Sequence, residues 1–336
     1  MPPKARVVIA AAASKQERQR ERRKIGSLKG QVIAAKTEER YHTCYEAFLK
    51  FHRLHRNFSV PAAEVFDEMT AEFIESLWDQ GEPKSQANYT LAAIQFFKPQ
   101  VKHHLPWSWK LVKVWQSLEL PQRATQLCPK TLMALSGQAF RWNQQAFGWL
   151  LVIGFTLFLR TGELLSIQAK DVILTRNSGV LYLPPSKTGK RNFLPLKRVE
   201  IQERATIQAF TALLRNKAPG DFLWGQSRGQ FMSLWHSIIQ SLKLDGMAYY
   251  PYSLRRGGAT SAYKAGSSLD QLVSRGRWAH VQTARLYLDT GMQALANITI
   301  PPSAQPLLHR ATAAFLAANQ EGTRGRAGAH QAGGLL

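Results

Sequence analysis

Residues 147–159 form the longest nearly uninterrupted apolar run in this chain, and the run ends directly on Arg160. A helix that crosses a membrane needs about 20 apolar residues. The run is shorter than that, so it predicts a helix buried in the core of a folded domain. With 336 residues, 45% of them hydrophobic, the chain is long enough for two domains that each have a core.

The chain carries a large excess of positive charge. Its 44 Lys and Arg residues outnumber 22 Asp and Glu residues, which gives a net charge of +22. Such an excess favours an anionic partner, and nucleic acid is the first candidate. The alternatives are a basic protein that is soluble for its own sake and one that binds anionic membranes. The two cysteines are too few for a disulfide framework, which fits a reduced, intracellular location.

The first third of the chain predicts a DNA-binding half. Residues 1–30 are rich in Lys and Arg and predict a basic flexible arm, which would also serve as a nuclear localisation patch. Residues 31–119 show apolar residues at helical spacing and predict a small domain of three or four helices. The third helix opens with polar residues suited to phosphates and base edges, Lys84, Ser85, Gln86 and Asn88. An ordinary solvated first turn explains them equally well.

The remaining chain predicts a second domain after a linker. Residues 120–129 lack periodicity and end on prolines, so we place the linker there, and the second domain at 130–300. It is expected to contain a helix over 140–159, three short strands over 171–174, 180–183 and 193–196, and then further helices from 201 onward. The fold class is therefore mainly α with a small three-stranded antiparallel sheet. A helix over 301–319 either folds back or docks on a neighbouring protomer in trans, and 320–336 is expected to be disordered.

Five residues of the second domain have the chemistry to hold and attack a phosphodiester: Arg160, Lys187, Arg255, Trp278 and Tyr287. Arginine suits the non-bridging oxygens, because its guanidinium is a planar fork of donors that stays charged. A tyrosine phenol is a tolerable nucleophile and also a tolerable leaving group, which makes strand cleavage reversible. Each residue alone has an ordinary structural explanation, such as a helix cap or a place in the core. The occurrence of all five in this order by chance is improbable.

This set resembles the catalytic residues of the tyrosine recombinases, the phage-integrase and Cre-like family. The match runs from LFLRTGELLSI through PPSKTGKRN and YSLRR to the Gly-Arg-Trp turn and TARLYLD. The Gly-Arg-Trp turn and the segment SLRRGGAT are also similar to recombinases of DIRS-type mobile elements. The resemblance implies that Arg160 and Arg255 bind the phosphate, that Glu163 buttresses Arg160, and that Tyr287 is the nucleophile. It implies that Lys187 is the general acid for the leaving 5′ oxygen. The further DNA contacts that we expect are Arg123, Lys190, Arg191 and Arg256.

One position departs from the family pattern. Histidine usually stands three residues before the second arginine, and this chain has Tyr252 there. A phenol can donate a hydrogen bond but is a poor base near neutral pH. Three explanations are open: Tyr252 suffices because the base has a modest role, His280 compensates, or activity is low. We favour the first and include Tyr252 in the catalytic set.

The resemblance implies an enzyme that breaks and rejoins double-stranded DNA through a 3′-phosphotyrosine bond. It also implies two halves that close around the duplex and a homo-tetramer on paired sites, located with DNA in the cell, in the nucleus of a eukaryote. No metal, nucleotide or other cofactor is implied, and no membrane partner. The alternatives are a catalytically weakened DNA-binding relative, a relaxing enzyme of the type IB topoisomerase kind, and a basic protein that binds RNA or acidic proteins.

Overall fold

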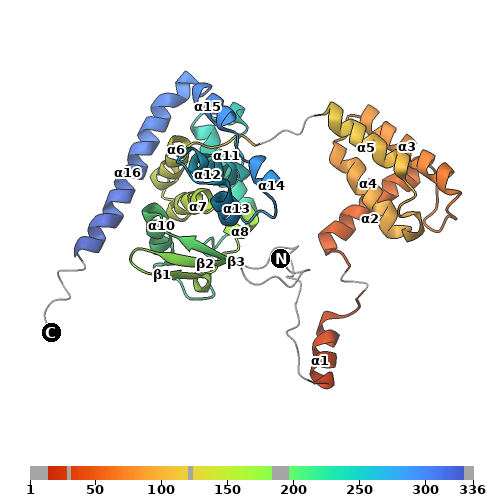
Figure 1. Ribbon diagram of the computed structural model, residues 1–336, viewed down its shortest axis with the longest axis horizontal. Helices are drawn as coiled ribbons and strands as arrows, with labels where there is room; N and C mark the ends of the chain where they lie inside the picture. Colours follow the sequence, from red (N-terminus) through yellow and green to blue (C-terminus); the bar gives the residue numbers. More distant parts are fainter. Residues whose placement is uncertain (1–13, 29–31, 120–123, 184–196, 329–336) are drawn as a thin grey trace. The chain divides into compact units, whose positions relative to one another are not determined.

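The computed structural model describes residues 14–28, 32–119, 124–183 and 197–328. The chain divides into two compact units, Met1–Gln122 and Arg123–Leu336 (Figure 1). The first unit opens with α1, Lys15–Ile25, within the segment for which the sequence predicts a flexible arm. The helix begins at a capping box, in which Ser14 and Glu17 bond to each other's backbone N–H. These caps explain a local helix in a segment with few apolar residues.

Four helices make up the rest of the first unit, as many as the sequence allows. They are α2 Ala35–Phe51, α3 Ala63–Asp79, α4 Lys84–Phe97 and α5 Pro106–Leu118, with a 3-10 turn at Pro99–Val101. Aromatic rings fill their shared core. Phe48 of α2 is fully buried and meets Phe66 and Phe73 of α3 edge-on, with ring centroids 5.9 and 5.7 Å apart. This geometry is a favourable one for aromatic pairs.

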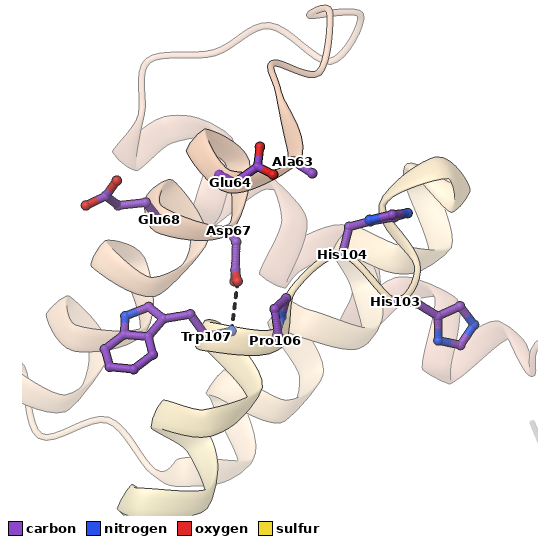
Figure 2. A pocket seen from close by; sticks show the side chains of 8 residues that line it. All are labelled: Ala63, Glu64, Asp67, Glu68, His103, His104, Pro106 and Trp107. Carbon is purple, nitrogen blue, oxygen red and sulfur yellow. Dashed lines mark hydrogen bonds between the residues drawn. The ribbon is translucent and has the colours of Figure 1, made fainter.

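A buried carboxylate from α3 holds the start of α5. Asp67 accepts hydrogen bonds from the backbone N–H groups of Trp107 and Ser108, at 2.8 and 2.9 Å, and from the Ser108 hydroxyl at 2.6 Å. Figure 2 shows Asp67 pointing at this helix start, beside a pocket that Glu64 and His104 also line. The residue at the N-cap of α5 makes no side-chain cap of its own, so Asp67 supplies the cap from another helix.

The second unit is mainly helical, with a small sheet between its early and late helices. The helices are α6 Pro129–Arg141, α7 Gln145–Thr156, α8 Thr161–Leu164, α10 Arg204–Leu214, α11 Arg228–Ser241, α12 Tyr252–Lys264, α13 Leu269–Gly276, α14 Val281–Arg285, α15 Thr290–Ile298 and α16 Gln305–Gly328. The single helix expected over 140–159 is wrong, because the chain breaks at Asn143, whose φ is 58°, before α7 begins. Within α7, residues 147–155 are all buried, as the apolar run predicts.

The three strands form one antiparallel sheet in the order β1-β2-β3, which confirms the predicted fold class. The strands are β1 Val172–Leu174, β2 Gly179–Leu183 and β3 Lys197–Ile201, with Leu181 paired to Val172 on one side and to Val199 on the other. The strand expected at 193–196 lies outside the described residues. Residues 197–201 form β3, where polar and apolar residues alternate and Val199 and Ile201 are buried.

The last helix packs within its own chain. Figure 1 shows α16 running along α6, and Phe315 of α16 stacks on Phe140 with ring centroids 6.0 Å apart. The helix continues to Gly328, beyond residue 319, where the sequence analysis ends it. The expected linker also differs in extent, because Leu127 is fully buried in the core of the second unit. Within the described residues, no helix is long and apolar enough to cross a membrane.

Candidate active site

Arg160 lies on the short turn between α7 and α8. Phe158 takes a left-handed conformation there, with φ 49°, and this conformation turns the chain sharply at the end of the buried helix. The Glu163 carboxylate then fixes Arg160 twice: Oε2 accepts the Arg160 backbone N–H at 2.9 Å and Oε1 pairs with Nη1 at 2.8 Å. The Arg160 side chain remains 44% exposed, so its other donors face solvent. It is therefore placed to receive an anion.

Arg255 comes from α12 and is fully buried. Its guanidinium donates to two backbone carbonyls, Phe158 O and, at 2.6 Å, Gly276 O. Its central carbon also lies 4.7 Å from the centre of the Trp278 ring and 5.3 Å from that of Tyr287. Burial, together with the charges of Arg160 and Arg277, lowers the pKa of Arg255 to about 10, so the side chain stays charged near neutral pH.

The hydroxyl of Tyr287 makes a hydrogen bond with the hydroxyl of Tyr252. Burial by itself would raise the pKa of the Tyr287 phenol, but the hydrogen bond from Tyr252 and the charge of Arg255 bring it below its usual value. Burial and the contact with Tyr287 raise the pKa of Tyr252 to about 12. Tyr287 is thus the phenol of the pair that ionises first, and once it has ionised Tyr252 is the donor of the hydrogen bond.

Trp278 forms the wall behind these phenols. Its side chain is buried, and its ring lies 4.7 Å from the Tyr287 ring and 6.4 Å from the Phe158 ring, measured between centroids. The indole Nε1 atom is buried and, among the described residues, makes no hydrogen bond of full geometry, but it is close enough to the Tyr287 hydroxyl to help lower the pKa of that phenol. The N–H therefore lies beside the Tyr287 oxygen and is suited to a ligand oxygen there.

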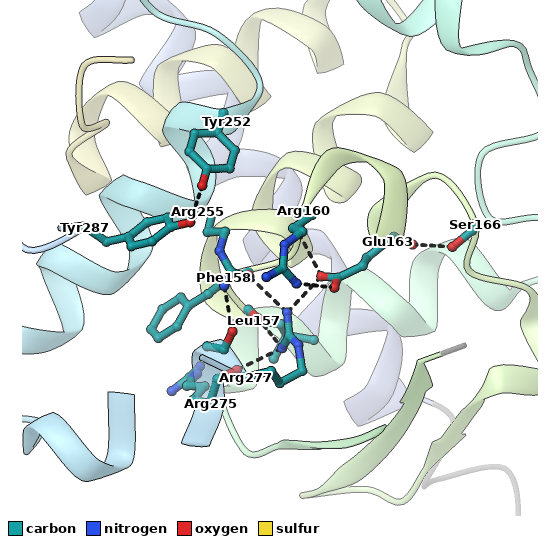
Figure 3. Close-up of polar contacts among 11 residues, drawn as sticks. Leu157, Phe158, Arg160, Glu163, Ser166, Tyr252, Arg255, Arg275, Arg277 and Tyr287 are labelled. Carbon is teal, nitrogen blue, oxygen red and sulfur yellow. Dashed lines mark hydrogen bonds and ion pairs between the residues drawn. The ribbon is translucent and has the colours of Figure 1, made fainter. Parts of the chain in front are cut away.

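The structure brings together six residues that the sequence predicts for the site, and Figure 3 labels all of them except Trp278. Tyr252, Arg255 and Trp278 contact Tyr287, and Glu163 holds Arg160 on the α7–α8 turn. Lys187, Lys190 and Arg191 lie outside the described residues, as does Arg123. His280 has an exposed side chain and stands at the N-cap of α14. Among the described residues, no group of three His, Cys, Asp or Glu side chains could hold a metal ion.

The expected DNA contacts outside this centre differ in their exposure. Arg256 of α12 is 7% exposed, so the structure places it in the interior of its unit rather than on a phosphate-binding surface. The polar residues at the start of α4 lie in the first unit. Ser85 is exposed, whereas Lys84, Gln86 and Asn88 are half-buried, and the Asn88 amide donates to the Lys84 carbonyl at 3.2 Å. Their role in DNA binding stays a prediction.

Sequence reasoning missed Arg277, the middle residue of the Gly-Arg-Trp turn. Its side chain is 5% exposed and its guanidinium pairs with Glu163 Oε2 at 3.0 Å. It also donates to the carbonyls of Leu157, Phe158 and Arg275, at 3.2, 3.0 and 2.8 Å. Its φ of 56° is left-handed, which ends α13 and turns Trp278 toward the site. In the sequence, the one sign that Arg277 belongs to the site is a charged residue between Gly276 and Trp278.

Glycines Gly257 and Gly258 in SLRRGGAT allow the close packing that sets α12 in place. A Cβ atom at Gly257 would lie 2.2 Å from the Leu127 carbonyl oxygen, and one at Gly258 would lie 2.0 Å from that of Phe155. Both obstacles are backbone atoms, which cannot rotate away. Gly258 therefore lets α12 approach α7 closely enough for Arg255 to reach the Phe158 carbonyl, and Gly257 lets it pack against the segment before α6.

The fold is found again among solved structures of DNA recombinases. The XerH site-specific recombinase bound to a palindromic difH substrate has a TM-score of 0.53 and 18% identity, and the match covers 76% of this chain and 78% of that chain. The Tn1549 transposon integrase in complex with transposon right end DNA has a TM-score of 0.54 and 15% identity, with 84% and 96% covered. The chain has the tyrosine recombinase fold.

A lambda integrase dimer bound to a COC′ core site matches this recombinase fold as well. Its TM-score is 0.54 and its identity 14%, over 78% of this chain and 74% of that chain. No family model and no curated protein matches the sequence. The likeness is therefore one of fold, and the function of this chain has to be argued from its own site residues.

Proposed function

We propose that this chain is a site-specific DNA recombinase that cleaves and rejoins strands through a 3′-phosphotyrosine bond at Tyr287. One observation carries the proposal: the Tyr287 hydroxyl lies among a phenol donor, a buried guanidinium and a buried indole, and the exposed guanidinium of Arg160 is close by. A nucleophile with such neighbours suits attack on a phosphodiester, because charge builds up on the non-bridging oxygens in the transition state.

In the proposed reaction, Tyr287 loses its proton to solvent, the phenolate oxygen forms a bond to phosphorus, and the bond from phosphorus to the 5′ oxygen breaks. Arg160 and the Trp278 N–H bind the non-bridging oxygens, and the charge of Arg255 favours both the phenolate and the phosphate. By resemblance, Lys187 gives its proton to the leaving 5′ oxygen. The phosphotyrosine keeps the energy of the broken bond, so rejoining needs no nucleotide cofactor.

Double-stranded DNA is the partner that the charge and the fold favour. A chain with a net charge of +22 gains from the release of counterions when it neutralises phosphates. Solved structures with this fold were determined with DNA bound. We extend the proposal to a tetramer on two paired sites and to a location with DNA in the cell, in the nucleus of a eukaryote.

The test starts from duplexes that the protein selects from a random pool, because the target sequence has to be found first. A selected duplex is then nicked near the cleavage site, so that the freed fragment diffuses away and the covalent adduct accumulates. We expect wild type to form a protease-sensitive adduct with DNA and Tyr287→Phe to form none. Tyr263→Phe is the matched control, because Tyr263 is an exposed tyrosine on the same unit and lies outside the site.

Two other results would each support a different function. DNA binding without any adduct, equal in wild type and Tyr287→Phe, would indicate a relative that has kept the DNA-binding surface and lost the chemistry. The replacement of histidine by Tyr252 makes this the first alternative. Relaxation of supercoiled DNA by a monomer without site preference would indicate a topoisomerase of the type IB kind.

A further inference from the structure

Glu163 lies between two arginines that come from opposite sides of the site. Its Oε1 atom pairs with Arg160 at 2.8 Å, and its Oε2 atom pairs with Arg277 at 3.0 Å. The carboxylate is 17% exposed and Arg277 is 5% exposed, so water screens this pair of contacts weakly. Burial alone would raise the pKa of Glu163, but the charges of Arg277 and Arg160 hold it below its usual value. The carboxylate is therefore ionised near neutral pH.

This arrangement decides the net charge that a bound phosphate meets. Arg160 and Glu163 alone would form a neutral pair, and a neutral pair attracts a phosphate weakly. With Arg277 included, one carboxylate is shared by two guanidiniums, so the three side chains together carry one positive charge. Since Arg277 is buried and Arg160 is exposed, that charge is presented to solvent at Arg160.

Arg277 also connects the two segments that carry the site. Its guanidinium donates to Leu157 and Phe158 on the α7–α8 turn, while its backbone ends α13 one residue before Trp278. The Phe158 carbonyl accepts from both Arg277 and Arg255, so three segments meet at one oxygen. A change at Arg277 therefore alters both the charge and the placement of Arg160.

We infer that Arg277 is a positioning residue for the phosphate: through the shared Glu163 carboxylate it keeps Arg160 both oriented and cationic. The inference rests on the proposed function, because it concerns the phosphate that Tyr287 attacks. Arg277 touches none of the reacting atoms and acts through Glu163.

Arg275 provides a matched control two residues away. It pairs with its own carboxylate, Glu203 at the N-cap of α10, and its guanidinium lies 4.9 Å from the centre of the Phe158 ring. Arg275→Met and Arg277→Met each remove one charge, one carboxylate contact and hydrogen bonds to the α7 end. Only the second substitution leaves the Arg160–Glu163 pair neutral. The change in net charge is thus matched between the two variants, whereas Arg277 is the more buried residue and makes more hydrogen bonds.

The first measurement is the rate of adduct formation on the nicked duplex, at saturating DNA. We expect Arg277→Met to slow this step about 10- to 100-fold, the range found when a preorganised charge contact is lost. Arg275→Met should keep at least about half of the wild-type rate, since its contacts stabilise the fold and leave Arg160 as it is. Arg277→Lys keeps the charge without the planar fork and should fall between Met and wild type, and it serves if Arg277→Met does not fold.

The double variant Glu163→Gln with Arg277→Met separates charge from structure. Removing both charges leaves Arg160 with its positive charge, and the amide oxygen introduced at position 163 still accepts from Arg160. We expect the double variant to be about tenfold faster than Arg277→Met, although it lacks more of the native contacts. A double variant no faster than Arg277→Met would overturn the inference, as would equal rates for Arg277→Met and Arg275→Met.

A second measurement is independent of cleavage. The melting temperature is compared in inorganic phosphate and in chloride at equal ionic strength. We expect phosphate to stabilise wild type, Arg275→Met and the double variant more than Arg277→Met. If wild type forms no adduct, the proposed function is overturned, and this phosphate-dependent shift still decides whether Arg277 keeps the Arg160 site cationic. Equal shifts for Arg275→Met and Arg277→Met would show that it does not.

Discussion

The hydroxyl of Tyr252 contacts the hydroxyl of Tyr287, although Tyr252 is the first residue of α12, Tyr287 lies in the turn after α14, and the two stand 35 positions apart in the chain. The contact brings together the proposed nucleophile and the one position at which the sequence departs from the family pattern that it resembles. Because the pKa of Tyr252 is raised to about 12 and that of Tyr287 is lowered, Tyr287 is the first of the two to lose its proton. Tyr252 is therefore suited to stabilise the Tyr287 phenolate as a hydrogen-bond donor, rather than to act as a base.

Replacing Tyr252 by phenylalanine should slow cleavage at neutral pH by about 10- to 100-fold, because a hydrogen bond to a charged group is worth roughly 1.5–3 kcal/mol and about 1.4 kcal/mol corresponds to tenfold in rate. The pH dependence should also move. The phenolate fraction of Tyr287 grows with pH, and its lowered pKa places this growth below the range of a free tyrosine. Without the donor, the rise in the cleavage rate should shift to higher pH. Single-turnover adduct formation across a pH series measures both effects.

Tyr250→Phe is the control for this prediction. Tyr250 is 45% exposed, lies two residues before Tyr252 and has no place in the site. Its substitution should leave the rate and the pH profile as in wild type. A Tyr252→Phe profile that coincides with wild type would mean that the phenol contact has no part in the reaction, and that another group activates Tyr287.

The sequence predicted which residues meet at the site better than it predicted how they are held. Arg160, Arg255 and Tyr287 were recognised because their residue types and order match a known chemistry. The contacts of Arg277 and the left-handed turn at Phe158 depend on how α13 approaches the α7–α8 turn, and no local pattern encodes that approach. A charged residue between Gly276 and Trp278 has no evident role until its distance to Glu163 is known.

Gly257→Ala should destabilise the second unit by about 3 kcal/mol, because the new methyl group would press against the Leu127 carbonyl and α12 would have to move. The measurement is urea denaturation. Gly229→Ala is the control on another helix: a Cβ there meets only the Ser227 hydroxyl, at 3.7 Å. Since alanine is the better helix former, this change should be neutral or stabilise by up to about 1 kcal/mol. Equal behaviour of the two variants would contradict the close-packing argument.

Asp67→Ala should destabilise the first unit by about 2–3 kcal/mol, because two backbone N–H groups at the start of α5 and the Ser108 hydroxyl lose their acceptor. The adjacent Glu68→Ala is the control, since Glu68 is exposed. Urea denaturation should show a lower midpoint for the first variant only. If both variants keep the wild-type midpoint, water replaces the carboxylate at no cost and the cap is unimportant.

The same cap shows why parts of the fold escape sequence reasoning. The helices were expected from apolar periodicity, which depends on each segment alone, and the three-stranded sheet from short β-rich segments between turns. The Asp67 carboxylate and its partners stand about 40 residues apart, so the sequence around α5 gives no sign of the residue that caps the helix. The strand Lys197–Ile201 escaped prediction for a related reason, because the inner face of its alternating polar and apolar residues becomes evident only beside β2.

Phe315→Ala tests whether α16 belongs to the core of its own chain. Phe315 is 6% exposed, stacks on Phe140 and also lies near Trp149, so its removal should cost about 3–5 kcal/mol in urea denaturation. The neighbouring Leu316 is 47% exposed, and Leu316→Ala should cost less than about 1 kcal/mol. At Gly137 of α6, a Cβ atom would collide with the Ala311 backbone of α16, so the two helices pack closely at this point as well. A Phe315→Ala variant as stable as wild type would instead mean that the helix leaves α6 in solution, which would free it to dock on a neighbouring protomer.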